Sequence, residues 1–216
     1  MPLLERRIPL AVVANREADI RQAISVGQTY GVAIVIVGGA EAWRVVQLLA
    51  ANHVPVILDP LDELPVSFDV LGARRDNAAL LARAGVLISF MVSGQGIYLS
   101  YNAGPALREG AGIAVANGLP YSQAIRAITQ SAGRIWGDPA VAGKPGIAGK
   151  PVIAGTLVPG AAANLVIWDA DPLEPSSAPA AVMFDGRESS LQTRQTLLRD
   201  RYRPPTASPM AASHAP

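Results

Sequence analysis

The sequence of 216 residues predicts an α/β fold built on a parallel sheet, followed by a few strands of different character nearer the carboxyl terminus. Three observations lead to this prediction. Short apolar runs are separated by longer segments with helical periodicity. The runs are nearly continuous rather than alternating, as in strands that are covered on both faces. The connections between them are long enough for right-handed βα crossovers.

The first half of the chain alternates predicted strands with predicted helices. The strands are 8–14, 32–38, 54–59 and 85–92, and the helices are 16–31, 40–53 and 74–84. In the first helix, apolar or small residues recur at helical spacing and define the expected buried face: Ile20, Ala23, Ile24 and Gly27. Gly31 is positioned to end that helix, because glycine readily adopts the left-handed conformation of a helix C-terminus.

The second half begins with two further predicted helices, at about 102–117 and 121–136. A Gly- and Pro-rich stretch follows, with the internal duplication AGKPGIAGKP, and it predicts a loop. Strands are then predicted at 164–169 and 180–189, and a helix at 190–202. The predicted divisions are a partial barrel at 1–139, a loop at 140–154, a β-domain segment with its helix at 155–202, and a disordered tail at 203–216.

Composition excludes several classes of function. A formal net charge of +1, with no basic stripe, gives no electrostatic footprint for nucleic acid. The absence of cysteine excludes disulfide frameworks, cysteine-based metal sites and thiol nucleophiles. No stretch approaches the roughly 20 apolar residues of a spanning helix, and the amino-terminal apolar run is too short for a signal peptide. As written, the sequence predicts a cytoplasmic protein without a membrane partner.

Two late segments stand out, GTLVPGAAANLVIWDADPLE at 155–174 and VMFDGRE at 182–188. They resemble the carboxyl-terminal signature of the amidohydrolase superfamily, and more narrowly its imidazolonepropionase-like branch. The segment 111–137 resembles the paired helices that precede this signature in the family. The resemblance implies a (β/α)₈ barrel with a small accompanying β-domain, of which this chain corresponds to the carboxyl-terminal half, with about four βα units.

The same resemblance implies where metal ligands would stand. Family members hold a divalent metal with histidines after the fifth and sixth barrel strands and an aspartate after the eighth, among other ligands. The corresponding positions here are near Val13, at Gly38 or Gly39, and near Val92 or Ser93. None of these residues is a metal ligand, and a nitrogen–oxygen site needs three or four ligands that converge. We therefore expect no cofactor in this chain, although a divalent metal is expected in intact members. The two histidines, His53 and His214, are expected to be structural or incidental.

Polar residues after the predicted strands are the remaining site candidates, because binding residues project from the carboxyl ends of barrel strands. The candidates for lining a substrate are Asn15, Arg16, Glu41, Asp59, Ser93, Gln95, Tyr98, Tyr101 and Asn102. Each has a structural alternative. Asn15 could cap the following helix, and Glu41 could be a favourable charge in a first helical turn. Asp59 could shape a turn, and the loop SGQGIYLSYNAG could be a glycine turn with aromatic packing. Asp169 and Asp171 are expected to be structural.

Two functional hypotheses follow. In the first, the chain is a truncated or metal-free member of a lineage of hydrolases that act on non-peptide C–N bonds, with an amide or lactam as its small-molecule partner. In the second, it is a catalytically inactive binding or structural domain. Four βα units cannot close a barrel, which needs about eight strands, so a homodimer is a further expectation.

Overall fold

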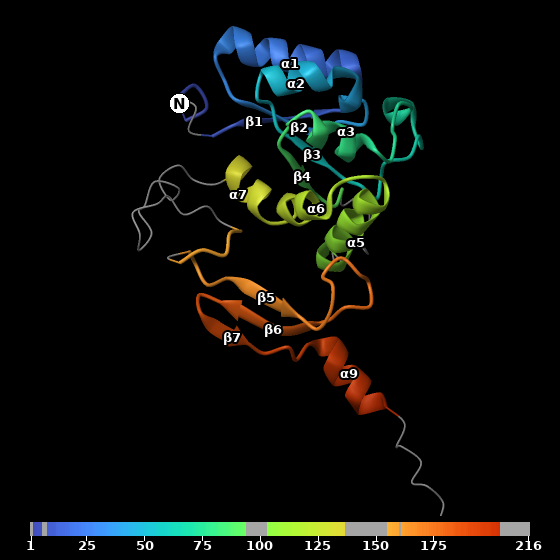
Figure 1. The fold of residues 1–216 in the computed structure, drawn as a ribbon, viewed down its shortest axis with the longest axis vertical. Coiled ribbons are helices and arrows are strands. Elements are labelled where there is room, and N and C mark those ends of the chain that lie inside the picture. The colour runs from blue at the N-terminus through green and yellow to red at the C-terminus, as the bar shows by residue number, and fades with distance from the viewer. Residues whose placement is uncertain (1, 6–7, 94–102, 137–154, 160, 204–216) are drawn as a thin grey trace, which may run out of the picture.

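The computed structural model describes residues 2–5, 8–93, 103–136, 155–159 and 161–203 (Figure 1). The predicted loop 140–154 lies outside these residues, as does the predicted tail apart from Arg203. Four parallel strands form the main sheet in chain order: β1 (Leu10–Ala14), β2 (Ile34–Gly38), β3 (Val56–Leu58) and β4 (Ile88–Phe90). The prediction of a parallel sheet of βα units is confirmed.

Helices fill the connections between these strands. They are α1 (Glu17–Tyr30), the 3-10 helix η1 (Ala42–Val45), α2 (Val46–Ala51), the 3-10 helix η2 (Phe68–Val70) and α3 (Asn77–Arg83). All four residues that the sequence places on the inner face of α1 are buried. Gly31 follows α1 with φ +67°, and its N–H donates to the carbonyl oxygen of Gly27. The glycine stop predicted for this helix is confirmed.

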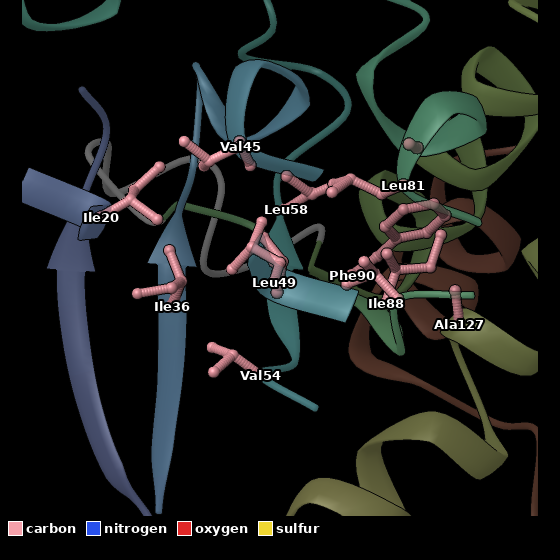
Figure 2. Close-up of a cluster of buried hydrophobic side chains, with 14 of the residues drawn as sticks. Ile20, Ile36, Val45, Leu49, Val54, Leu58, Leu81, Ile88, Phe90 and Ala127 are labelled. Atoms are coloured by element: carbon pink, nitrogen blue, oxygen red, sulfur yellow. The ribbon is translucent and has the colours of Figure 1, made fainter. Parts of the chain in front are cut away.

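The core lies between the sheet and the helices α1, α2 and α3. Every second strand residue faces it, so Ile36, Leu58 and Phe90 meet Leu49 and Leu81 in one buried cluster (Figure 2). On the opposite face of the sheet, Val35 and Ile57 pack against Ile135 of α7, described below. That face is open at β1, where the side chain of Val13 is 79% exposed. Among the described residues, β1 pairs only with β2, so the other edge of β1 has no strand beside it.

The remaining elements begin with α5 (Ala103–Ala116), α6 (Tyr121–Ala127) and α7 (Gln130–Trp136), and α6 and α7 lie against β4. A separate antiparallel sheet follows, formed by β5 (Leu165–Trp168), β6 (Pro179–Phe184) and β7 (Arg187–Ser189), with α9 (Arg194–Tyr202) after it (Figure 1). This sheet is anchored to α5 by Arg108. Its guanidinium group donates to the carbonyl oxygen of Pro172 at 2.7 Å and lies 4.2 Å from the ring centre of Trp168.

Three sequence predictions need correction. The helix predicted at 40–53 starts as η1, because two N–H groups bond three residues back, from Ala42 to Gly39 and from Arg44 to Glu41. The helix predicted at 121–136 is two helices. At the break, the Thr129 N–H bonds to Arg126, and its hydroxyl donates to the Ile125 carbonyl oxygen.

The third correction concerns the strand predicted at 180–189, which is the hairpin of β6 and β7. Asp185 and Gly186 join the two strands with φ of +48° and +74°. An Asp-Gly pair with two positive φ angles matches the twist of a two-residue hairpin turn, so the chain reverses there instead of continuing. The sequence already contained this signal.

Candidate functional site

The carboxyl ends of the four parallel strands lie along one edge of the main sheet, which places several predicted site residues near one another. Asn15 directly follows β1, Gly38 ends β2, Asp59 directly follows β3, and Ser93 lies shortly after β4. This is the edge where α/β folds bind ligands. The described candidates therefore share this edge, and their contacts show what each side chain binds.

The end of β2 has no side chain of its own because Asn15 occupies the space. Gly38 has φ +96°, and a Cβ atom built on it would lie 2.4 Å from the Asn15 Oδ1 atom. The main chain is tied at the same point, since Glu41 N–H donates to the Asn15 carbonyl oxygen at 2.8 Å. A side chain at position 38 would have to displace Asn15 and adopt an unfavourable backbone conformation. The glycine is therefore a packing requirement of this edge.

Asp59 connects the ends of β3 and β4. Its side chain is buried, and the main-chain N–H groups of Leu61 and Ser93 donate to its two oxygens at 3.0 and 2.6 Å. Both oxygens are therefore used by the main chain. The neighbouring carboxyl of Asp62 has a raised pKa, chiefly because burial disfavours its charge and also because Asp59 repels it.

Glu41 caps helix α1 from a different part of the chain. Its Oε2 atom accepts the Glu17 N–H at 2.8 Å, and its carboxylate lies against Gly72. The residue at the N-cap position is Arg16, whose side chain makes no capping bond. The proposed capping role for Asn15 is therefore wrong. An N-terminal N–H group of α1 is instead bonded by the carboxylate of Glu41, which lies far from it in the sequence.

Arg16 and Trp43 hold the segment between β3 and α3 over this edge. The Arg16 guanidinium donates to the Phe68 carbonyl oxygen at 3.1 Å and pairs with Asp69 at 3.0 Å. The indole N–H of Trp43 donates to the Gly72 carbonyl oxygen at 2.9 Å. The guanidinium groups of Arg44 and Arg74 lie 4.4 and 4.7 Å from the Trp43 ring centre. We refer below to residues 60–76 as the covering loop.

The four remaining candidates fall in a stretch that the structure does not describe. Gln95, Tyr98, Tyr101 and Asn102 lie outside the described residues, so their role as substrate contacts stays a prediction. Sequence reasoning missed Trp43, Glu63 and Asn77. Glu63 and Asn77 gave no sequence signal, because a glutamate in a polar loop and an asparagine beside a helix start are usually exposed.

Solved structures with this architecture include three hydrolase-type proteins. An amidohydrolase from Thermotoga maritima MSB8 is 26% identical, with a TM-score of 0.72, and the match covers 87% of this chain and 44% of that one. A prolidase complexed with N-methylphosphonate-L-proline is 17% identical, with a TM-score of 0.57, and the match covers 84% and 44%. An adenosine deaminase from Xanthomonas campestris with bound zinc is 17% identical, with a TM-score of 0.55 and coverage of 89% and 49%.

No protein-family model matches the chain, and no curated protein matches its sequence. The structural likeness concerns the fold. In fold, the chain is a partial amidohydrolase-superfamily domain. It spans less than half the length of each of these solved amidohydrolase-fold proteins. The predicted fold class, a partial barrel of about four βα units with additional carboxyl-terminal strands, is confirmed.

The strand ends of this amidohydrolase domain do not fit the metal that the superfamily implies. In the part of the chain that the structure describes, no three histidine, cysteine, aspartate or glutamate side chains are grouped to hold a metal ion. Val13 is apolar, Gly38 has no side chain, and both oxygens of Asp59 accept main-chain hydrogen bonds. His53 lies in the turn between α2 and β3, at the opposite end of that strand. We derive no reaction step through a metal.

The two aspartates of the β-domain segment make local structural contacts. Asp169 accepts the Ala178 N–H at 2.8 Å, and Asp171 accepts the Leu173 N–H and the Tyr121 hydroxyl, both at 2.8 Å. These bonds shape the connection between β5 and β6 and attach it to α6. They are the structural contacts that the sequence led us to expect. Among the described helices of this amidohydrolase domain, none is long and apolar enough to cross a membrane.

Proposed function

We propose that this chain contributes one part of the barrel of an amidohydrolase-type protein from a lineage of hydrolases acting on non-peptide C–N bonds, and that it is inactive by itself. The observation that carries the proposal is the set of contacts made by the residues at the carboxyl ends of β1, β2 and β3. Asn15 fills the space at Gly38, and the carboxylate of Asp59 is taken up by two main-chain amides. These contacts hold the edge of the sheet together, and among the described residues no three ligand side chains converge there.

The open edge of β1 supports the idea that other strands complete this barrel. Four strands cover only part of a closed barrel, for which about eight are needed. The exposed side chain of Val13 lies on the face that Ile135 of α7 covers farther along the sheet. In our proposal, strands from further chain or from a second copy of this chain continue the sheet beyond β1. Metal ligands and acid–base groups for hydrolysis would have to come from strands of further chain, because a second copy would bring the same strand ends.

Elemental analysis and a hydrolysis assay test this proposal together. We expect protein that has been dialysed against chelator and then against buffer to retain far less than one equivalent of zinc, iron or manganese. We also expect no turnover of amide or lactam substrates above background, with or without added zinc. One equivalent of tightly held metal, or turnover that the isolated chain supports, would contradict the proposal.

The second candidate function is a catalytically inactive binding domain, which the position of Asn15, Asp59 and Ser93 at the carboxyl ends of parallel strands favours. A lactam titrated into isotopically labelled protein distinguishes the two. Saturable shifts of the Asn15, Asp59 and Ser93 amide signals, without turnover, support a binding domain. An unchanged spectrum at millimolar lactam supports the structural role alone.

A further inference from the structure

Glu63 and Asn77 form a buried pair in which two polar atoms have no partner. Glu63 lies in the covering loop and is 8% exposed, and Asn77, the first residue of α3, is 0% exposed. The Asn77 Nδ2 group donates to the Gly39 carbonyl oxygen at 3.0 Å and to Glu63 Oε1 at 3.3 Å. The two remaining side-chain oxygens of the pair, Glu63 Oε2 and Asn77 Oδ1, are buried without a hydrogen-bond partner.

Both of these oxygens are acceptors when Glu63 is ionised, so neither can satisfy the other. A single proton changes this. A carboxylic acid presents one O–H donor beside one acceptor oxygen, and a primary amide presents the complementary donor and acceptor. On a protonated Glu63, Oε2–H would donate to Oδ1 while Nδ2–H donates to Oε1, and the two side chains would then form a closed ring. The proton removes two buried, unsatisfied acceptors at once.

The charged groups around the pair also disfavour an ionised Glu63. Asp59 and Asp76 both face it and add negative charge, while the Arg74 guanidinium is engaged by Asp76. The groups that favour the ionised form are hydrogen-bond donors, namely the Asn77 amide and the Arg74 main-chain N–H. Burial outweighs them and raises the pKa of Glu63 to about 8.

We infer that Glu63 carries a proton in the folded protein at neutral pH, and that this proton closes an acid–amide pair with Asn77 that holds the covering loop onto the end of β2. Asn77 is the link in this arrangement, because the same Nδ2 group bonds the Gly39 carbonyl oxygen just beyond β2. Other contacts of the covering loop, from Arg16 to Phe68 and from Trp43 to Gly72, do not depend on this proton.

The direction of the pH effect follows from proton linkage. An accessible glutamate has a pKa of 4.5, and the folded value is about 8. Between these two values the folded state binds the proton and the unfolded state does not, so stability falls as pH rises. The stabilisation of the folded state by the Glu63 proton is complete below about pH 4.5, decreases up to about pH 8 and is absent above it. In that interval the unfolding constant rises by about tenfold per pH unit.

The test compares wild type with Glu63→Gln by urea unfolding between pH 5 and 9. Glutamine retains the shape and the acceptor oxygen, and its N–H₂ group donates to Asn77 Oδ1 without a proton from solvent. We expect wild type to show a pH-dependent increase in its unfolding constant, relative to Glu63→Gln, of about tenfold per unit up to pH 8. Glu109→Gln, which removes an exposed carboxyl from α5, is the control and should retain the wild-type slope.

A direct titration of the wild-type carboxyl group makes the inference testable even if Glu63→Gln folds poorly. The ¹³C signal of the Glu63 carboxyl group should titrate with a midpoint near pH 8, accompanied by shifts of the Asn77 side-chain amide signals. A midpoint near the value of an accessible glutamate would overturn the inference. Parallel stability curves for wild type and Glu63→Gln would overturn it as well.

Discussion

Replacing Gly38 with alanine tests whether Asn15 and the backbone conformation together explain the missing side chain at the end of β2. The backbone has φ +96°, where a residue with a Cβ atom is strained by roughly 1–2 kcal/mol. The new Cβ would also lie 2.4 Å from Asn15 Oδ1. Because that oxygen is the end of a movable side chain, its displacement adds about 0.5–1.5 kcal/mol. We expect Gly38→Ala to lose about 1.5–3.5 kcal/mol of unfolding free energy.

The measurement is urea unfolding at 25 °C, followed by tryptophan fluorescence and by circular dichroism. Gly110→Ala is the matched control, because it makes the same chemical change inside α5, where the nearest atom to the new Cβ is Pro60 Cδ at 3.5 Å. That variant should be more stable than wild type by about 0.5–1 kcal/mol, since alanine is the better helix former. Opposite signs for the two variants are therefore expected.

A double variant separates the two sources of cost. Asn15→Ala in the Gly38→Ala background removes the contact with Oδ1 but leaves the strained φ, so only the smaller part of the loss should be recovered. A Gly38→Ala protein within about 0.5 kcal/mol of wild type would refute the reasoning, because surface changes without a structural cause have effects of that size. Full recovery in the double variant would show that backbone strain contributes nothing.

Two further predictions concern the cap of α1 and the open edge of the sheet. Glu41→Ala should lower the free energy of unfolding by about 1 kcal/mol, because it removes the acceptor of the Glu17 N–H. Asp19→Ala removes an acid from the same first turn and should lower it by only about a few tenths of a kcal/mol. Equal losses of the two variants in urea unfolding would contradict the assigned cap. For the edge, β1 pairs only with β2 among the described residues, so we expect a dimer of the isolated chain by light scattering. A monomeric species with a sharp thermal transition would argue against association through β1.

Local sequence patterns were enough to predict the order of the elements and the parallel arrangement of the main sheet. Apolar runs separated by helical repeats predicted all four parallel strands, and the spacing of Ile20 and Ile24 predicted the buried face of α1. Gly31 was predicted as a helix stop because glycine readily adopts the left-handed conformation. These features depend on local periodicity and on the backbone preferences of single residues, which are visible in a short window of sequence.

Two boundaries were predicted less well than the elements themselves. At the break between α6 and α7, the Thr129 hydroxyl donates to the Ile125 carbonyl oxygen, which is a local contact. Gly155 also lies there, and a Cβ on that glycine would lie 2.6 Å from the Thr129 carbonyl carbon. No window around 121–136 contains that neighbour. At the hairpin of β6 and β7, the turn signal of Asp185 and Gly186 is local and is already present in the sequence.

The roles of the site residues were decided by the tertiary structure. The sequence placed Asn15, Glu41 and Asp59 near the carboxyl ends of strands, because that position follows from the strand order. Only the folded chain shows that Asn15 fills the space at Gly38 and that Glu41 caps a helix 24 positions away. Burial of Glu63 against Asn77 was equally invisible. Side-chain burial and hydrogen bonding depend on neighbours in space, and those neighbours are set by how the covering loop packs on the sheet, which local periodicity does not specify.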